Sequence, residues 1–537
     1  MSRDNEVIFY TDGRHSNVYI YEPPMDKRLY TAPIDELVDL GIDTISYAVG
    51  DCRVLLYDTK VGERWGHNLR RTNHIIWYRA ALNVTQFVED GNDPLQVVCD
   101  RAHELGFTFI PSLLLGMQHQ EPAEINDCRC SDFCFEHPEY QIGPEPDFRQ
   151  ARWDDPARFS YAIPEVRQNR LDVIGELVSS YDTDGIELNL IDYAPFVARR
   201  EIPEHTQTFT DFVGDVRRLC DTAAKQQNRP KRLIVRAAAS LAGCKAIGID
   251  LEGMIGDEMV DTVIAMTPHS TGQMEQHPAS VAELVQATNG KSVKIVRGIS
   301  TGVNHDAFRM APREMLVAQV TNGYDAGAQG VFFSTYYPNG YPYADADLAN
   351  LRNMGHPELL TRKDKHYAVR QGPNGPDDTP GGYDQPHPLP VELEVGKPGP
   401  SQTLYVSDDV APVKDAGELS RCELRVRLVS LIHDDTFDLW FNGVQIPRDH
   451  QNWADWTYSV RPVPGNRMNS HYWITVDLLR LGPLPMQGDN SVRVDLTHHD
   501  PRCDPPVVLH DVELIIQYRD RRHAPRRDEW AFDPRQV

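Results

Sequence analysis

The sequence predicts a (β/α)8 barrel followed by an all-β sandwich. Two observations carry this prediction. Strand-like and helix-like segments alternate up to about residue 370, and beyond a stretch rich in proline and glycine the apolar residues recur with period two. A chain of 537 residues is too long for one hydrophobic core. The expected domains are a barrel over 1–370, a linker over 371–400, a β-sandwich accessory domain over 401–520 and a basic tail over 521–537.

Eight short apolar segments are predicted as the barrel strands. They are residues 7–12, 44–50, 107–114, 185–191, 233–238, 262–267, 293–299 and 331–336. Amphipathic segments between most of them are predicted as helices, for example 32–40, 94–105, 164–180, 206–225, 280–288 and 313–327. Eight strands with intervening helices fit a closed barrel. An open doubly wound sheet is the alternative, but no Gly-x-Gly-x-x-Gly motif follows the first strand.

The C-terminal part shows the alternation of half-buried antiparallel strands. The segments are 424–429, 437–441, 472–476, 491–496 and 512–518. Asn442-Gly443, directly after the second segment, is a hairpin signal. Residues 371–400 hold too many prolines and glycines for regular structure. The sandwich is therefore expected to pack on the barrel and to supply no catalytic carboxylate.

The net charge of the chain excludes some classes of binding partner. A net charge of −25 argues against nucleic acid and anionic membranes. No apolar run reaches the length of a membrane span. The charged N-terminus does not read as a signal peptide, and most of the nine cysteines lie singly, so a cytoplasmic location is expected.

The strand-like stretch 185–191 is the most informative part of the chain. Ile186 and Leu188 alternate there with Glu187 and Asn189. Polar groups in a strand covered on both faces cost several kcal/mol unless they are paired or used. The inner face of a barrel strand leads to the mouth, where substrates bind. Glu187 is therefore predicted to be a catalytic carboxylate, with a satisfied structural pair as the alternative.

Other polar residues follow the predicted strands, at the end where barrel active sites lie. Asp51 and Asp192 are predicted as catalytic partners of Glu187, with Asp12 as a further candidate for the second carboxylate. Arg14 and His15 also lie after the first strand. The predicted substrate-binding residues are Asp12, Asn189, Arg236, His119, His269, Arg297 and Tyr337. Paired carboxylates near aromatic side chains are typical of glycoside hydrolysis.

Arg236 and Arg297 lie in otherwise apolar strands and each needs an anionic partner. Glu187 or Asp51 can supply it, and so can an acidic group on a substrate, such as a uronate or a sulfate. No metal and no cofactor are expected. Cys128, Cys130 and Cys134, followed by His137, are the one arrangement with metal-ligand spacing, but they lack paired Cys-x-x-Cys hooks.

Several segments resemble, in their order along the chain, the bacterial glycosyl-hydrolase-like, family-10-like barrel proteins. They are residues 7–13, 41–47, 93–95, 102–106, 137–139 and 181–189. The resemblance implies a catalytic barrel with a C-terminal β-sandwich. The family's fourth-strand motif usually reads Asp-Gly-Ile-Glu-Leu-Asp, and here its last position is Asn189. The same offset holds the nucleophile of α-amylase barrels, so an Asp nucleophile is missing at this position and Glu187 is left as the best carboxylate.

The predicted function is glycoside hydrolysis of a small oligosaccharide or glycoside, with Glu187 as general acid. Two alternatives remain at this point. One is a carbohydrate-binding barrel without hydrolytic activity, suggested by Asn189. The other is a lyase or another sugar-modifying enzyme that acts on an acidic sugar. A carbohydrate is the expected partner, and the tryptophans of the sandwich leave a homo-oligomer open.

Overall fold

The structure is a computed structural model. It describes residues 5–50, 54–69, 71–72, 74–116, 131–148, 156–266, 274–303, 311–334, 342–371, 388–456 and 471–519. No helix among these residues is both long and apolar enough to cross a membrane.

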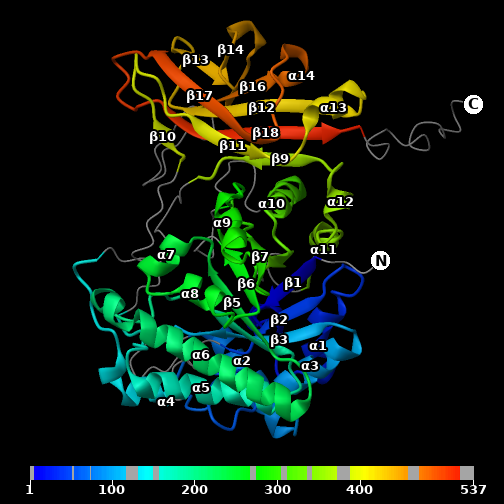
Figure 1. Cartoon of the computed structure of the whole chain (residues 1–537), viewed down its shortest axis with the longest axis vertical. Coiled ribbons are helices and arrows are strands. Elements are labelled where there is room, and N and C mark those ends of the chain that lie inside the picture. The colour runs from blue at the N-terminus through cyan, green and yellow to red at the C-terminus, as the bar shows by residue number, and fades with distance from the viewer. Residues whose placement is uncertain are drawn as a thin grey trace, which may run out of the picture.

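The N-terminal part is a closed barrel whose parallel strands follow one another in chain order (Figure 1). The strands are β1 (Glu6–Thr11), β2 (Thr44–Ala48), β3 (Thr108–Leu114), β4 (Gly185–Asn189), β5 (Arg232–Ala238), β6 (Thr262–Met266), β7 (Lys294–Ile299) and β8 (Gly330–Phe333). β8 pairs with β1 and closes the barrel. Each strand lies within its predicted segment or begins one residue before it, so the predicted barrel is confirmed.

Helices surround the barrel. They are α1 (Lys27–Asp35), α2 (Ile75–Glu89), α3 (Pro94–Glu104), α4 (Asp132–Glu136), α5 (Pro164–Ser179), α6 (Ile202–Gln227), α7 (Leu241–Ala246), α8 (Leu251–Gly256), α9 (Ala279–Ala287), α10 (Arg313–Asp325), α11 (Asp345–Leu351) and α12 (Pro357–Leu360). The predicted first helix, 32–40, was placed too late. It begins after Asp26, whose carboxylate accepts a hydrogen bond from the backbone N–H of Leu29.

The barrel strands have two buried faces with different neighbours. The inner cluster includes Ile8, Tyr10, Ile234, Val296 and Phe332. The apolar residues next to them along the same strands belong to the larger core between the barrel and its helices. They are Val7, Phe9, Leu233, Val235, Ile295, Val331 and Phe333. Residue parity along a strand therefore decides which side chains face the barrel interior.

The C-terminal part contains two antiparallel sheets around a second core. One has the order β10 (Val391–Glu392), β18 (Val508–Tyr518), β12 (Leu419–Val429), β16 (His471–Asp477) and β15 (Asn452–Trp456). The other has the order β11 (Gln402–Val406), β17 (Gly488–His498), β13 (Thr436–Phe441) and β14 (Val444–Ile446). Asn442 and Gly443 have φ values of 49° and 76° in the predicted hairpin turn. The predicted β-sandwich is confirmed.

The two parts meet along α10 (Figure 1). α10 is buried on nearly all sides, and Ala318 belongs to the core of the sandwich. β9 (Lys365–Ala368) follows the barrel in the chain and pairs with β18. Gln276, which precedes α9, is 2% exposed and accepts a hydrogen bond from the backbone N–H of Ala368 at 2.8 Å.

Candidate active site

Glu187 on β4 lies inside the barrel in a buried ion pair. Its side chain is 0% exposed, and its Oε1 accepts a hydrogen bond from Nε of Arg236 at 2.7 Å. Nη2 of Arg236 lies 2.5 Å from the same oxygen. Oε2 of Glu187 accepts a hydrogen bond from the hydroxyl of Ser46 on β2. The anionic partner expected for Arg236 is therefore Glu187.

Two aromatic rings hold the guanidinium of Arg236. Its Cζ lies 4.2 Å from the ring centroid of Tyr10 and 4.6 Å from that of Phe332. Burial is the largest single influence and would lower the pKa of Arg236, but the charge and hydrogen bond of Glu187 together with the charges of Tyr10 and Asp192 raise it overall. The cation is thus fixed between two strands and faces two carboxylates.

Asp192 lies just beyond the end of β4 and is partly exposed. Its Oδ2 accepts a hydrogen bond from Nδ2 of Asn189 at 2.7 Å. Oδ1 of Asn189, which is fully buried, accepts from the backbone N–H groups of Ile191 and Asp192, both at 3.1 Å. Asn189 therefore folds the chain back after the strand and holds the Asp192 carboxylate. Tyr193 follows with φ 66°, an uncommon conformation for a residue other than glycine.

Asp12 directly follows the last residue of β1. The next residue, Gly13, has φ 64° and starts a tight turn. Oδ1 of Asp12 accepts hydrogen bonds from the backbone N–H groups of Arg14 at 3.0 Å and His15 at 2.9 Å. Oδ2 is bonded to Nδ1 of His15. Burial alone would raise the pKa of Asp12, but the bond from His15 and the charge of Arg14 lower it to about 2.

Tyr10 interacts electrostatically with Arg236, Asp12 and Glu187. Burial raises its pKa well above the ordinary value, Arg236 opposes this, and the charges of Asp12 and Glu187 add to the rise. The ends of β1, β4 and β5 thus bring together Asp12, Glu187, Asn189, Asp192 and Arg236. We call these five residues, with His15, the mouth cluster.

Arg297 does not join the mouth cluster. It has the parity of Ile295 and Ile299, so its side chain lies on the outer face of β7, against α10. It is 3% exposed and its Nη2 donates to the backbone carbonyl of Glu275. Burial lowers the pKa of Arg297 to about 10, although the charge of Glu275 opposes this. The prediction that Arg297 binds substrate at the mouth is corrected by this position.

Four predicted site residues, Asp51, His119, His269 and Tyr337, lie outside the described residues, as do Cys128 and Cys130. Cys134 is described; it is buried, and its Sγ accepts a hydrogen bond from the hydroxyl of Ser131 at 3.1 Å. Nothing in the sequence marks Ser46 and Tyr10 as site residues, because each looks like an ordinary strand residue. His15 was noted without a role, and the Asp-x-x-His spacing at the end of β1 is the signal that points to it.

Ligand atoms of Glu63, His67 and Asp132 come within 4.8 Å of one another, as metal ligands would. Glu63 also accepts hydrogen bonds from the backbone N–H groups of Asp132 and Phe133, at the start of α4. His67 Nε2 lies 3.1 Å from Glu63 and 3.2 Å from Asp132. An ion pair that caps α4 accounts for this arrangement.

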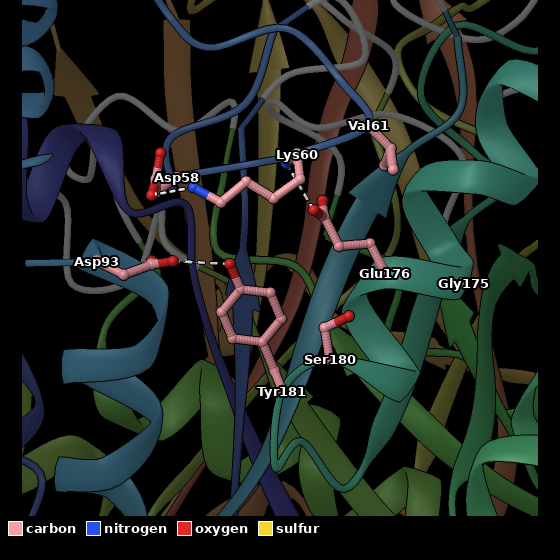
Figure 2. A pocket seen from close by; sticks show the side chains of 8 residues that line it. All are labelled: Asp58, Lys60, Val61, Asp93, Gly175, Glu176, Ser180 and Tyr181. Atoms are coloured by element: carbon pink, nitrogen blue, oxygen red, sulfur yellow. Dashed lines mark hydrogen bonds and ion pairs between the residues drawn. The ribbon is translucent and has the colours of Figure 1, made fainter.

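A pocket of about 500 Å³ lies apart from the mouth cluster, between α3 and the end of α5 (Figure 2). Its carboxylates already have partners. Glu176 accepts hydrogen bonds from Tyr57, Thr59 and the backbone N–H of Lys60. Asp93 accepts one from the hydroxyl of Tyr181 at 2.7 Å. The bonds of Glu176 tie the loop at residues 57–60 to α5, and the bond of Asp93 ties the start of α3 to the segment that follows α5.

Among known protein families, one family model matches the first part of the barrel. The family model described as glycosyl hydrolase-like 10 matches residues 10–207. A search of curated proteins found no match.

Solved structures with a similar fold are distant. The alpha-L-fucosidase isoenzyme 2 from Paenibacillus thiaminolyticus has a TM-score of 0.40 at 12% identity, over 67% of this chain and 50% of that one. The PgaB (BpsB) glycoside hydrolase domain from Bordetella bronchiseptica has a TM-score of 0.39 at 14% identity, over 66% of this chain and 98% of that one. This chain thus spans about half the length of the fucosidase. Over residues 10–207 the chain matches the glycosyl hydrolase-like 10 family, and the resemblance read from its sequence is confirmed there.

Proposed function

We propose that this protein hydrolyses a glycosidic bond of a small oligosaccharide or glycoside at the mouth of its barrel. The observation that carries the proposal is the Asp192 carboxylate. It is partly exposed, it is held by the buried Asn189, and it lies at the end of β4 beside the Glu187–Arg236 pair. A positioned carboxylate at this end of a barrel strand suits proton transfer or stabilisation of the positive charge that develops on a sugar ring.

The geometry changes the role that we assign to Glu187. A general acid needs a proton to donate, whereas both oxygens of Glu187 accept hydrogen bonds and one of them faces a guanidinium. We therefore propose Glu187 as the anion that holds Arg236, with Asp192 as the carboxylate that reaches the sugar. Asp51 remains a proposed second carboxylate.

The same contacts make the acidic-sugar reading less favourable. That reading relied on arginines free to neutralise a uronate. Arg236 is paired with Glu187, and Arg297 lies on the outer face of β7. A lyase is therefore not proposed.

The test is turnover of a panel of 4-nitrophenyl glycosides and of unmodified oligosaccharides by the full chain and by Asp192→Asn. The variant keeps the size of the side chain, and a reacting carboxylate predicts a fall of about 10²–10⁴-fold. Asp172→Asn is the matched control, because Asp172 on α5 also accepts a bond from a side-chain amide, that of Gln168, at 2.7 Å. Equal turnover in the wild type and a folded Asp192→Asn variant would contradict the assignment, and no turnover by the wild type would contradict hydrolysis.

A further inference from the structure

We infer that Asp12 and His15 form a carboxylate–imidazole pair that transfers protons in the mouth cluster. The inference rests on the proposed function. Asp12 is 3% exposed, and its Oδ1 is used by two backbone N–H groups of the turn after β1. The shape of the turn accounts for those two bonds. It does not require the further bond from Oδ2 to Nδ1 of His15.

The imidazole of His15 is held on a second side. Its ring packs edge-on against that of Tyr19, with centroids 5.1 Å apart, and Tyr19 packs in turn against Trp65 at 6.2 Å. Yet 49% of the His15 side chain is exposed. Within the described part of the chain, Nε2 of His15 has no hydrogen bond. Two contacts thus fix the ring and leave one nitrogen available to a substrate.

This arrangement decides which nitrogen is basic. When Nδ1 donates its hydrogen to the Asp12 carboxylate, the neutral imidazole carries its lone pair on Nε2. The carboxylate also stabilises the imidazolium that forms when Nε2 takes up a proton. A buried aspartate that orients a half-exposed histidine is therefore suited to proton transfer.

The proton balance of hydrolysis fits this pair. The oxygen of water bonds to the anomeric carbon and releases one proton, and the bond from that carbon to the departing oxygen breaks. The departing oxygen gains one proton. Nε2 of His15 can accept the first proton and donate the second, so the imidazole is unchanged after a turnover. His15 would then be a catalytic residue and Asp12 its positioning residue.

The first experiment does not depend on activity. The full chain is treated with diethyl pyrocarbonate, which acylates unprotonated imidazole nitrogen, and the rate at each histidine is followed by peptide mass spectrometry. We expect His15 to react several-fold faster than His356, whose Nδ1 lies 3.1 Å from the exposed Glu358. Asp12→Asn should slow the reaction at His15, whereas Glu358→Gln should leave the rate at His356 unchanged. Equal rates at His15 in the wild type and Asp12→Asn would overturn the pair.

The second experiment uses a substrate found in the glycoside panel. His15→Ala should lower turnover by about 10²–10⁴-fold, and added imidazole should restore part of it. Rescue by imidazole separates a chemical role from a structural one and does not require Asp12 to be changed. Full activity of His15→Ala, or a loss that imidazole leaves unchanged, would overturn the catalytic role. If the wild type turns over no glycoside, hydrolysis fails and the acylation rates alone decide whether the pair exists.

Discussion

The side chain of Arg297 occupies the space that a Cβ atom on Gly323 would need. A Cβ built there would lie 2.4 Å from Cδ of Arg297 and 3.2 Å from its Cβ. Both residues are buried at the point where the outer face of β7 meets α10. The absence of a side chain at Gly323 therefore lets a long cation lie flat between the barrel and a helix.

Gly323→Ala is expected to lower the free energy of unfolding by about 1–3 kcal/mol, the usual effect of overpacking. The better helix propensity of alanine, worth about 1 kcal/mol, opposes this loss. Gly256→Ala on α8 is the matched control, because a Cβ there meets nothing within 4 Å. Denaturant unfolding should rank the control above the wild type and Gly323→Ala below it. The opposite order for Gly323→Ala would show that Arg297 moves without cost.

Removing one member of the Glu187–Arg236 pair is expected to be more damaging than removing both. Glu187→Met or Arg236→Met alone leaves a buried charge without its partner, which costs about 3–5 kcal/mol, whereas a double replacement by apolar groups is often close to neutral. A double-mutant cycle on unfolding free energies measures the difference. The exposed Asp215–Arg218 pair on α6 serves as the control, and its coupling should stay below about 1 kcal/mol. Additive effects at Glu187 and Arg236 would argue against a coupled pair.

Asp12 should make stability depend on acidity. Its pKa in the folded protein is about 2, below the ordinary value of 3.8, so its contribution is complete above pH 3.8 and is lost as the pH falls through 2. The difference in unfolding free energy between the wild type and Asp12→Asn should therefore be constant from pH 7 to 5 and shrink at lower pH. A difference that grows on acidification would show the opposite sign of linkage.

His67 should make the protein less stable as the pH rises. Hydrogen bonding to Glu63 is the largest cause that raises its pKa, from 6.5 to about 9. Its contribution to stability is therefore complete below pH 6.5 and is lost as the pH rises through 9. The melting temperature of His67→Gln should be below that of the wild type at pH 6 and equal to it at pH 10. His433→Gln is the control, because the His433 side chain is 81% exposed.

The sequence predicted the barrel well, because eight apolar segments at regular spacing leave few other folds. It also placed Glu187 in the interior. Glu187 alternates with the apolar residues Ile186 and Leu188, so its side chain lies on the opposite face of the strand from theirs. The face taken by Arg297 was not predictable. A parallel strand is apolar on both faces, so its sequence carries no alternation from which parity can be read. Arg236 and Arg297 look alike in sequence and lie on opposite faces of their strands.

The sequence also did not show which side chains form hydrogen bonds with one another. Asn189 reads as a departure from a family motif, and only the fold shows that its amide holds Asp192 three residues later. The bond of Ser46 to Glu187 joins residues 141 positions apart. Such pairs depend on strand order and register, which local patterns do not specify.

The pairing of β9 with β18 has a consequence for any attempt to separate the two parts. A chain ended near residue 370 would retain β9 without its partner strand, and would uncover α10 where Ala318 now packs in the sandwich core. An unpaired strand edge next to a bared apolar helix favours association between copies. The barrel expressed alone is therefore expected to aggregate, and a cut that keeps it monomeric will have to fall before Lys365 and replace the apolar face of α10 with polar residues.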